Sequence, residues 1–146
     1  VSWMPAYGPE QRGGTANVTV IVSDEPVSSP VLSAYDTAII LNQPSMDKFE
    51  RMVKPGGTLI YDDFGILEPP TRTDVDIHCV KAMRLASEQR LAKCFNMVVL
   101  GSFLKVHPIV SLDSVMKALR KTLPERHHHL LPMNEEAIRQ GAQLIG

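Results

Sequence analysis

The sequence has little of what most specialised sites require. Two cysteines, Cys79 and Cys94, occur in 146 residues, too few for a disulfide framework or for a metal site built from four thiolates. Positive charge is not in excess, because 15 Lys and Arg face 16 Asp and Glu, so we do not expect a dedicated nucleic-acid binder. No apolar run reaches the ~20 residues that a membrane span needs. These counts favour a cytoplasmic protein with no nucleic-acid or membrane partner.

Catalytic and metal-binding motifs are equally scarce. No G-x-S-x-G elbow is present, and Cys79 and Cys94 fall in apolar patterns that favour packed, inert thiols. The run His127–His129 has no carboxylate or cysteine at ligand spacing beside it, which favours a surface or interface role over a metal site. We therefore assign no catalytic residue and no metal ligand.

The apolar pattern predicts one α/β domain spanning residues 1–146. A helix opened by Pro44 and closed by a turn at Lys54–Gly57 separates two buried-type strands, which makes a βαβ unit and a parallel sheet. The predicted strands are Asn17–Ser23, Thr37–Asn42, Thr58–Asp62 and Val75–Val80. The last third is predicted to be helical, with Ser111 and Asn134 as the N-caps of its final two helices.

The first candidate for a contact site is a polar loop near the start of the chain. Its glycines let the backbone approach a ligand or a partner closely, and Arg12 offers a planar fork for carboxylate or phosphate. A tight surface turn with an Arg12–Glu10 pair explains the same residues equally well. The candidate residues are Tyr7, Gly8, Pro9, Glu10, Arg12, Gly13, Gly14 and Thr15.

The second candidate is Asn42 with Gln43, which follow a predicted parallel strand. Open α/β sheets bind ligands at the carboxyl ends of their strands. Simple capping of the next helix competes with that interpretation, and these residues alone favour capping.

Several strings resemble, in order along nearly the whole chain, the gamma subunit or gamma domain of the 2-oxoacid:ferredoxin oxidoreductases, the pyruvate/ketoisovalerate oxidoreductase gamma family. The most specific is Y-G-P-E-Q-R-G-G-T, which begins at Tyr7. The others are S-D-E-P from Ser23, N-Q-P-S-M-D-K-F from Asn42, K-P-G-G from Lys54, N-M-V-V-L-G from Asn96, P-E-R-H-H-H from Pro124 and P-M-N from Pro132.

The resemblance implies a Rossmann-like three-layer domain with a mainly parallel sheet. It implies a part of a complex that decarboxylates a 2-oxoacid, passes electrons to ferredoxin and makes an acyl-CoA. Thiamine diphosphate, Mg²⁺ and the iron–sulfur clusters would then lie in partner subunits, with coenzyme A as co-substrate and no cofactor in this chain alone. The implied partners are the alpha and beta subunits, a ferredoxin-like delta subunit as a further candidate, and ferredoxin through the complex.

The chain departs from the family at its start, where the strand, G-x-G-G-x-G loop and helix of the family are not seen. The strings lean towards 2-oxoglutarate or branched-chain members rather than pyruvate members. A stand-alone α/β nucleotide-binding protein and a pure assembly module are the alternative interpretations.

Overall fold

A computed structural model describes residues 1–8 and 16–146, and the chain forms two compact units. The first unit is Val1–Tyr35 and the second is Asp36–Gly146. The single domain over residues 1–146 stays a prediction.

The first unit contains a two-stranded antiparallel sheet of β1 (Ser2–Tyr7) and β2 (Ala16–Ile21). Trp3 pairs with Val20 and Pro5 with Val18. The β-branched run predicted strand β2, whereas β1 was not predicted. Among the described residues of this unit, only Thr19 is buried, so the hairpin has almost no core of its own.

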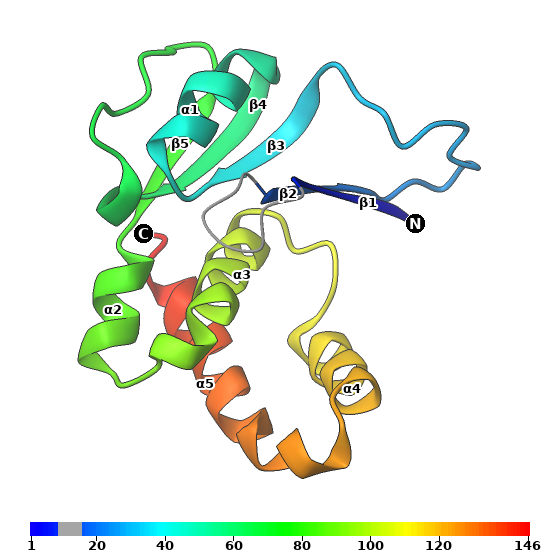
Figure 1. The fold of residues 1–146 in the computed structure, drawn as a ribbon, viewed down its shortest axis with the longest axis vertical. Coiled ribbons are helices and arrows are strands. Elements are labelled where there is room, and N and C mark those ends of the chain that lie inside the picture. The colour runs from blue at the N-terminus through cyan, green and yellow to red at the C-terminus, as the bar shows by residue number, and fades with distance from the viewer. Residues whose placement is uncertain (9–15) are drawn as a thin grey trace. The chain divides into compact units, whose positions relative to one another are not determined.

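The second unit is built on a three-stranded parallel sheet with strand order β3-β4-β5 (Figure 1). Strand β3 spans Tyr35–Ile40, β4 spans Val53–Asp62 and β5 spans Asp76–Val80. Strands β4 and β5 run parallel, from the pair Thr58 and Asp76 to the pair Asp62 and Val80.

Five α-helices surround or follow this sheet in the described part of the chain. Helix α1 connects β3 to β4, and the other four make up the C-terminal part. Their bounds are Gln43–Phe49 for α1, Ala82–Glu88 for α2, Phe95–Val106 for α3, Leu112–Thr122 for α4 and Leu131–Gln143 for α5. Short 3-10 turns lie at Glu50–Met52, Asp63–Gly65, Ala92–Cys94 and Glu125–Leu130.

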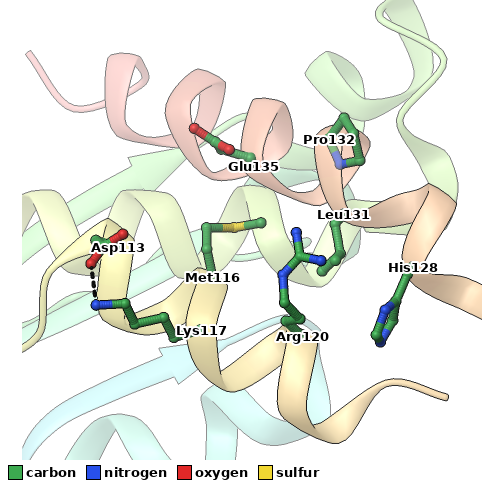
Figure 2. A pocket seen from close by; sticks show the side chains of 8 residues that line it. All are labelled: Asp113, Met116, Lys117, Arg120, His128, Leu131, Pro132 and Glu135. Atoms are coloured by element: carbon green, nitrogen blue, oxygen red, sulfur yellow. Dashed lines mark ion pairs between the residues drawn. The ribbon is translucent and has the colours of Figure 1, made fainter. Parts of the chain in front are cut away.

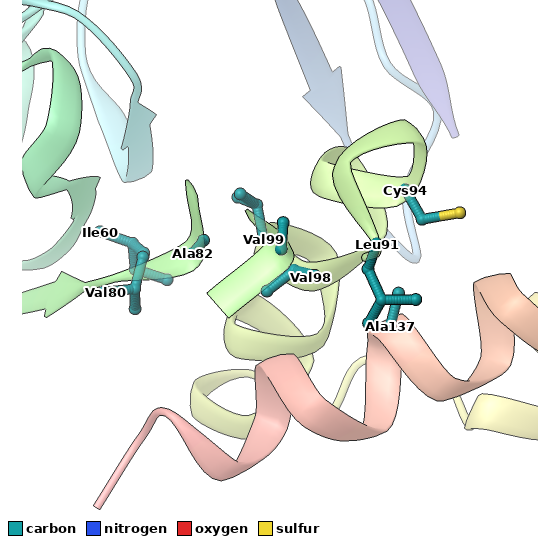
Figure 3. Close-up of a cluster of buried hydrophobic side chains, with 9 residues drawn as sticks. Ile60, Val80, Ala82, Leu91, Cys94, Val98, Val99 and Ala137 are labelled. Carbon is teal, nitrogen blue, oxygen red and sulfur yellow. The ribbon is translucent and has the colours of Figure 1, made fainter. Parts of the chain in front are cut away.

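Neighbouring side chains of β4 point to opposite faces of the sheet. A separate hydrophobic cluster covers each face. Leu59 packs with Ile40 and Met46 beneath α1. Ile60 packs on the other face with a second cluster drawn in Figure 3, which also contains Val80, Ala82, Ala86, Leu91, Cys94, Val98, Val99 and Ala137. The predicted three-layer α/β arrangement with a helical C-terminal third is confirmed.

Helices α3 and α5 pack side by side at a glycine contact (Figure 1). Gly101 lies against the carbonyl oxygen of Ile138, and Gly141 lies against the carbonyl oxygen of Val98. Ser102 Oγ donates to the Gly141 carbonyl oxygen at 2.8 Å. The two backbones approach so closely because neither glycine has a Cβ.

Two predicted helix boundaries are wrong. The first is the predicted turn at Lys54–Gly57, which belongs to β4. Within this strand Gly56 adopts a φ of +77°, and its N–H donates to Asp74 O at 2.7 Å. Helix α5 begins at Leu131, because the preceding 3-10 turn continues into it, and Asn134 lies inside it with Nδ2 donating to Leu130 O.

Candidate functional site

The glycine-rich candidate loop lies mostly outside the described residues. Tyr7 is the last residue of β1 and its side chain is exposed, and Gly8 follows it. Six of the candidates, Pro9, Glu10, Arg12, Gly13, Gly14 and Thr15, fall in residues 9–15, outside the described part of the chain. Their role in a contact stays a prediction.

Asn42 and Gln43 lie together at the start of α1, after the carboxyl end of β3. Asn42 caps the helix, with Oδ1 accepting from Ser45 N at 3.0 Å. Gln43 Nε2 donates to Asp47 Oδ1 at 2.8 Å, while Gln43 Oε1 accepts two backbone N–H groups from the loop after β4. Asn42 therefore has the capping role that its sequence favoured, and a ligand or partner contact by either residue stays a prediction.

The loop from Asp63 to Val75 is bonded to the 3-10 turn after α1, partly through Glu50 of that turn and partly through Arg72 of the loop. Glu50 Oε1 accepts from Thr71 N at 2.7 Å and from Arg72 N at 3.1 Å. Arg72 donates to the carbonyl oxygens of Glu50 and Val53 and forms a two-pronged pair with Asp74. The hydrogen bonds from Arg72 lower the pKa of the Asp74 carboxyl. These contacts tie the end of the loop to the segment between α1 and β4.

Asp62 closes β4 on the other face of the sheet. Its side chain is only 2% exposed, and Oδ1 accepts from Met83 N at 3.0 Å, which ties the end of β4 to the first turn of α2. Sequence reasoning did not single out Asp62. The acidic pair Asp62–Asp63, at the end of a buried-type strand, was the signal that could have identified it.

Tyr61 and Cys79 face each other across β4 and β5. Burial, followed by the hydrogen bond between the two side chains, raises the pKa of Tyr61 to about 12. Cys94 is buried, and burial raises its thiol pKa, as an inert thiol requires. Cys79 is exposed, so the prediction of a packed thiol there is wrong.

A groove of about 370 Å³ runs between α4 and α5 (Figure 2). Its charges are largely balanced, because Lys117 pairs with Asp113 at 2.8 Å and Glu135 pairs with Arg139 outside the groove. The groove is lined by Asp113, Met116, Lys117, Arg120, His128, Leu131, Pro132 and Glu135. With both signs of charge on an open surface, it has no arrangement that selects an anion or a cation.

The three histidines lie in the 3-10 turn before α5, where the His127 and His129 ring centroids are 6.5 Å apart and His128 has a separate partner. His128 Nε2 lies 2.9 Å from Leu123 O, and His127 Nε2 accepts from Arg126 Nε at 3.2 Å. In residues 1–8 and 16–146, no three His, Cys, Asp or Glu side chains gather as a metal site would require. None of the helices in these ranges is long and apolar enough to cross a membrane.

Comparison with known proteins assigns the family. Residues 1–144 match the family of pyruvate ferredoxin/flavodoxin oxidoreductases. The chain belongs to this family. The resemblance of its sequence motifs to the oxidoreductase gamma subunits is thereby confirmed.

Individual members of the family are similar over most of this chain. The ketoisovalerate oxidoreductase subunit VorA of Methanothermobacter thermautotrophicus is 35% identical over 97% of this chain. The 2-oxoglutarate synthase subunit KorC of Methanocaldococcus jannaschii is 34% identical over 82% of it. The chain spans 29% of the first relative and 65% of the second.

A solved family structure has the same fold. The gamma subunit of a keto/oxoacid ferredoxin oxidoreductase from Geobacter sulfurreducens is 25% identical, and the similarity covers 98% of this chain and 77% of that one, with a TM-score of 0.77.

Proposed function

We propose that this chain is the gamma-type part of a 2-oxoacid:ferredoxin oxidoreductase and works in the cytoplasm as a subunit of that complex. In the overall reaction the carboxylate of the 2-oxoacid leaves as CO₂, the acyl group passes to the sulfur of coenzyme A as the thiol proton is released, and the two electrons pass to ferredoxin. The observation that carries the proposal is the family match over residues 1–144.

We further propose a 2-oxoglutarate or branched-chain 2-oxoacid as the substrate of the complex. The support is that the two relatives described above are named for ketoisovalerate and for 2-oxoglutarate. In this proposal the assembled enzyme, and not this chain alone, recognises the substrate.

In this proposal the residues of the chain act by assembly and contact rather than by holding a cofactor. The described residues offer no cluster of metal ligands, and Cys79 and Cys94 lie on different elements. Thiamine diphosphate, Mg²⁺ and the iron–sulfur clusters would therefore be held by the alpha and beta subunits and by a delta subunit where one is present. Tyr7, Gly8 and the residues up to Thr15 would contact coenzyme A or a neighbouring subunit, together with Asn42 and Gln43.

The test is to purify the chain from its native source through an affinity tag and to identify what accompanies it. We expect larger subunits, a brown colour, and 2-oxoacid-dependent reduction of ferredoxin that requires coenzyme A. The chain expressed alone should be colourless and inactive. Recovery of the native chain without other subunits and with a bound nucleotide would overturn the proposal.

A further inference from the structure

The loop that follows β4 displays large apolar side chains at the carboxyl end of the sheet. Phe64 is 77% exposed, Leu67 is 87% exposed, and Leu41, at the end of β3, is 41% exposed. The backbone of Gly65 lies directly against the carbonyl oxygen of Leu41, so the loop and the end of β3 are in contact. We call Leu41, Phe64 and Leu67 the apolar tip.

The apolar tip is held in place by polar contacts beneath it. Gln43 Oε1 accepts from Leu67 N and from Glu68 N, both at 2.8 Å. The Gln43 side chain is itself oriented by the hydrogen bond that its Nε2 donates to Asp47 Oδ1. On the other side of the loop, Ile66 packs into the core beneath α1. The loop is therefore anchored both by its backbone and by the inward side chain of Ile66. Because the loop is already ordered, binding through Phe64 and Leu67 costs little additional conformational entropy.

The residues that flank the apolar tip are acidic. Asp63 precedes Phe64 and Glu68 follows Leu67. Neither carboxylate forms an ion pair with any residue in the described ranges, whereas Asp74, farther along the same loop, is neutralised by Arg72. The tip is therefore an apolar centre with uncompensated negative charge at its margin. Its complement is an apolar pocket with a basic rim.

We propose that the apolar tip docks into an apolar pocket with a basic rim on another subunit of the same oxidoreductase complex. This inference rests on the proposed function and adds the surface that joins the subunits. Aromatic side chains near the centre of an interface carry a large share of the binding energy, so Phe64 is the main anchor. Asp63 and Glu68 steer the encounter and fix its orientation.

The experiment compares assembly of tip variants with the partner subunits that copurify with the native chain. Phe64→Asp and Leu67→Asp each change a mostly exposed side chain, so the denaturation midpoint of the chain should stay the same. We expect each variant to bind the partner subunits at least tenfold more weakly. Ile109→Asp is the matched control, because Ile109 is also an exposed apolar residue but lies in the segment between α3 and α4. It should bind like the wild type.

The charged margin has its own variant and control. Glu68→Lys should slow association and weaken its dependence on salt, because the basic rim then meets a like charge. Glu125→Lys makes the same change at an exposed position remote from the tip in sequence, and it should leave the association rate unchanged.

The outcomes separate this inference from the proposed function. Wild-type assembly and activity together with equal assembly of Phe64→Asp would overturn the docking surface and leave the proposed function intact. Absence of any partner for the wild type would overturn both. If Phe64→Asp abolished only self-association of the chain, the surface would belong to a second copy and the inference would be wrong.

Discussion

Arg12 is the residue whose substitution tests the glycine-rich loop most directly. If its guanidinium pairs with a buried carboxylate or phosphate in the complex, Arg12→Ala strands the partner charge and should weaken assembly or turnover by about 2–5 kcal/mol. Arg12→Lys keeps the charge but loses the planar fork, so a smaller loss is expected. Turnover and subunit retention in the reconstituted complex measure both. A solvated turn residue would give only about 0–1 kcal/mol, and wild-type behaviour of the alanine variant would reject a contact role.

Gly101 and Gly141 lie at the close contact between α3 and α5. A Cβ at Gly141 would overlap the carbonyl oxygen of Val98, and one at Gly101 would overlap that of Ile138. Gly141→Ala should therefore lower the free energy of unfolding by about 1–3 kcal/mol, because α3 and α5 must move apart. Denaturant unfolding of the second unit measures this. Gly146→Ala, which has nothing near it, is the control, and equal midpoints for the two variants would refute the close contact.

Tyr61 should make stability fall at alkaline pH. Burial and the bond to Cys79 raise its folded-state pKa to about 12, from an ordinary value of 10.0. Below pH 10 the phenol is protonated in both states. Between about pH 10 and pH 12 the unfolded chain loses this proton while the folded chain keeps it, so unfolding becomes more favourable as the pH rises.

The measurement for Tyr61 is the denaturation midpoint at about pH 9 and about pH 11.5. The wild type should lose more stability across this interval than Tyr61→Phe, which has no phenol proton to lose. Equal losses in the two proteins would show that Tyr61 ionises at its ordinary pKa.

At the scale of single elements, α4 depends on its N-cap. Ser111 Oγ accepts from Ser114 N at 3.1 Å, and no side chain of α4 is fully buried, so packing contributes less to this helix than to α3. Ser111→Ala should cost about 0.5–2 kcal/mol, and Ser111→Asp should retain most of that energy. Hydrogen exchange measures the effect, because the backbone amides of α4 should be less protected in Ser111→Ala than in the wild type. Equal protection in the alanine variant and the wild type would contradict it.

Elements with a strong local signal were predictable from the sequence, and elements specified by tertiary contacts were not. The cap at Ser111 and the strands β4 and β5 follow from hydroxyl and apolar patterns that act locally. Strand β1 was missed because it contains Pro5 and no β-branched residue, so its own sequence does not indicate a strand. It is a strand because it pairs with β2. Asn134 was mistaken for a cap because the sequence does not reveal that a 3-10 turn continues into α5.

The candidate site was predictable to a smaller degree. Sequence position placed Asn42 and Gln43 at the end of a parallel strand, and they lie there. The two hydrogen bonds that Gln43 Oε1 accepts from the loop after β4 were not predictable, since they join residues more than twenty positions apart. The exposure of Phe64 and Leu67 was hidden for the same reason, because apolar residues in a sequence are expected to be buried.

At the scale of the whole molecule, most of the large apolar side chains described in the first unit are exposed rather than buried. Trp3, Tyr7, Val18 and Val20 are each more than half exposed. By the strand register they share one face of the hairpin with Pro5 and Ala16. Isolated two-stranded hairpins are marginal in water. An exposed apolar face favours association with other chains, and so do strand edges that pair with no further strand in the described part of the chain. The net charge of −1 supplies little repulsion to oppose it.

We therefore expect the chain expressed without partners to self-associate, and Val18→Lys with Val20→Lys to reduce that association. Lysines on this face add charge repulsion, while the pairing of β1 with β2 is left in place. Sedimentation velocity across a range of concentrations measures the change. Ile109→Lys with Val110→Lys is the matched control, because both residues are exposed apolar residues in the segment between α3 and α4, and it should not restore the monomer. A clean monomer for the wild type at high concentration would reject the exposed face as a source of association.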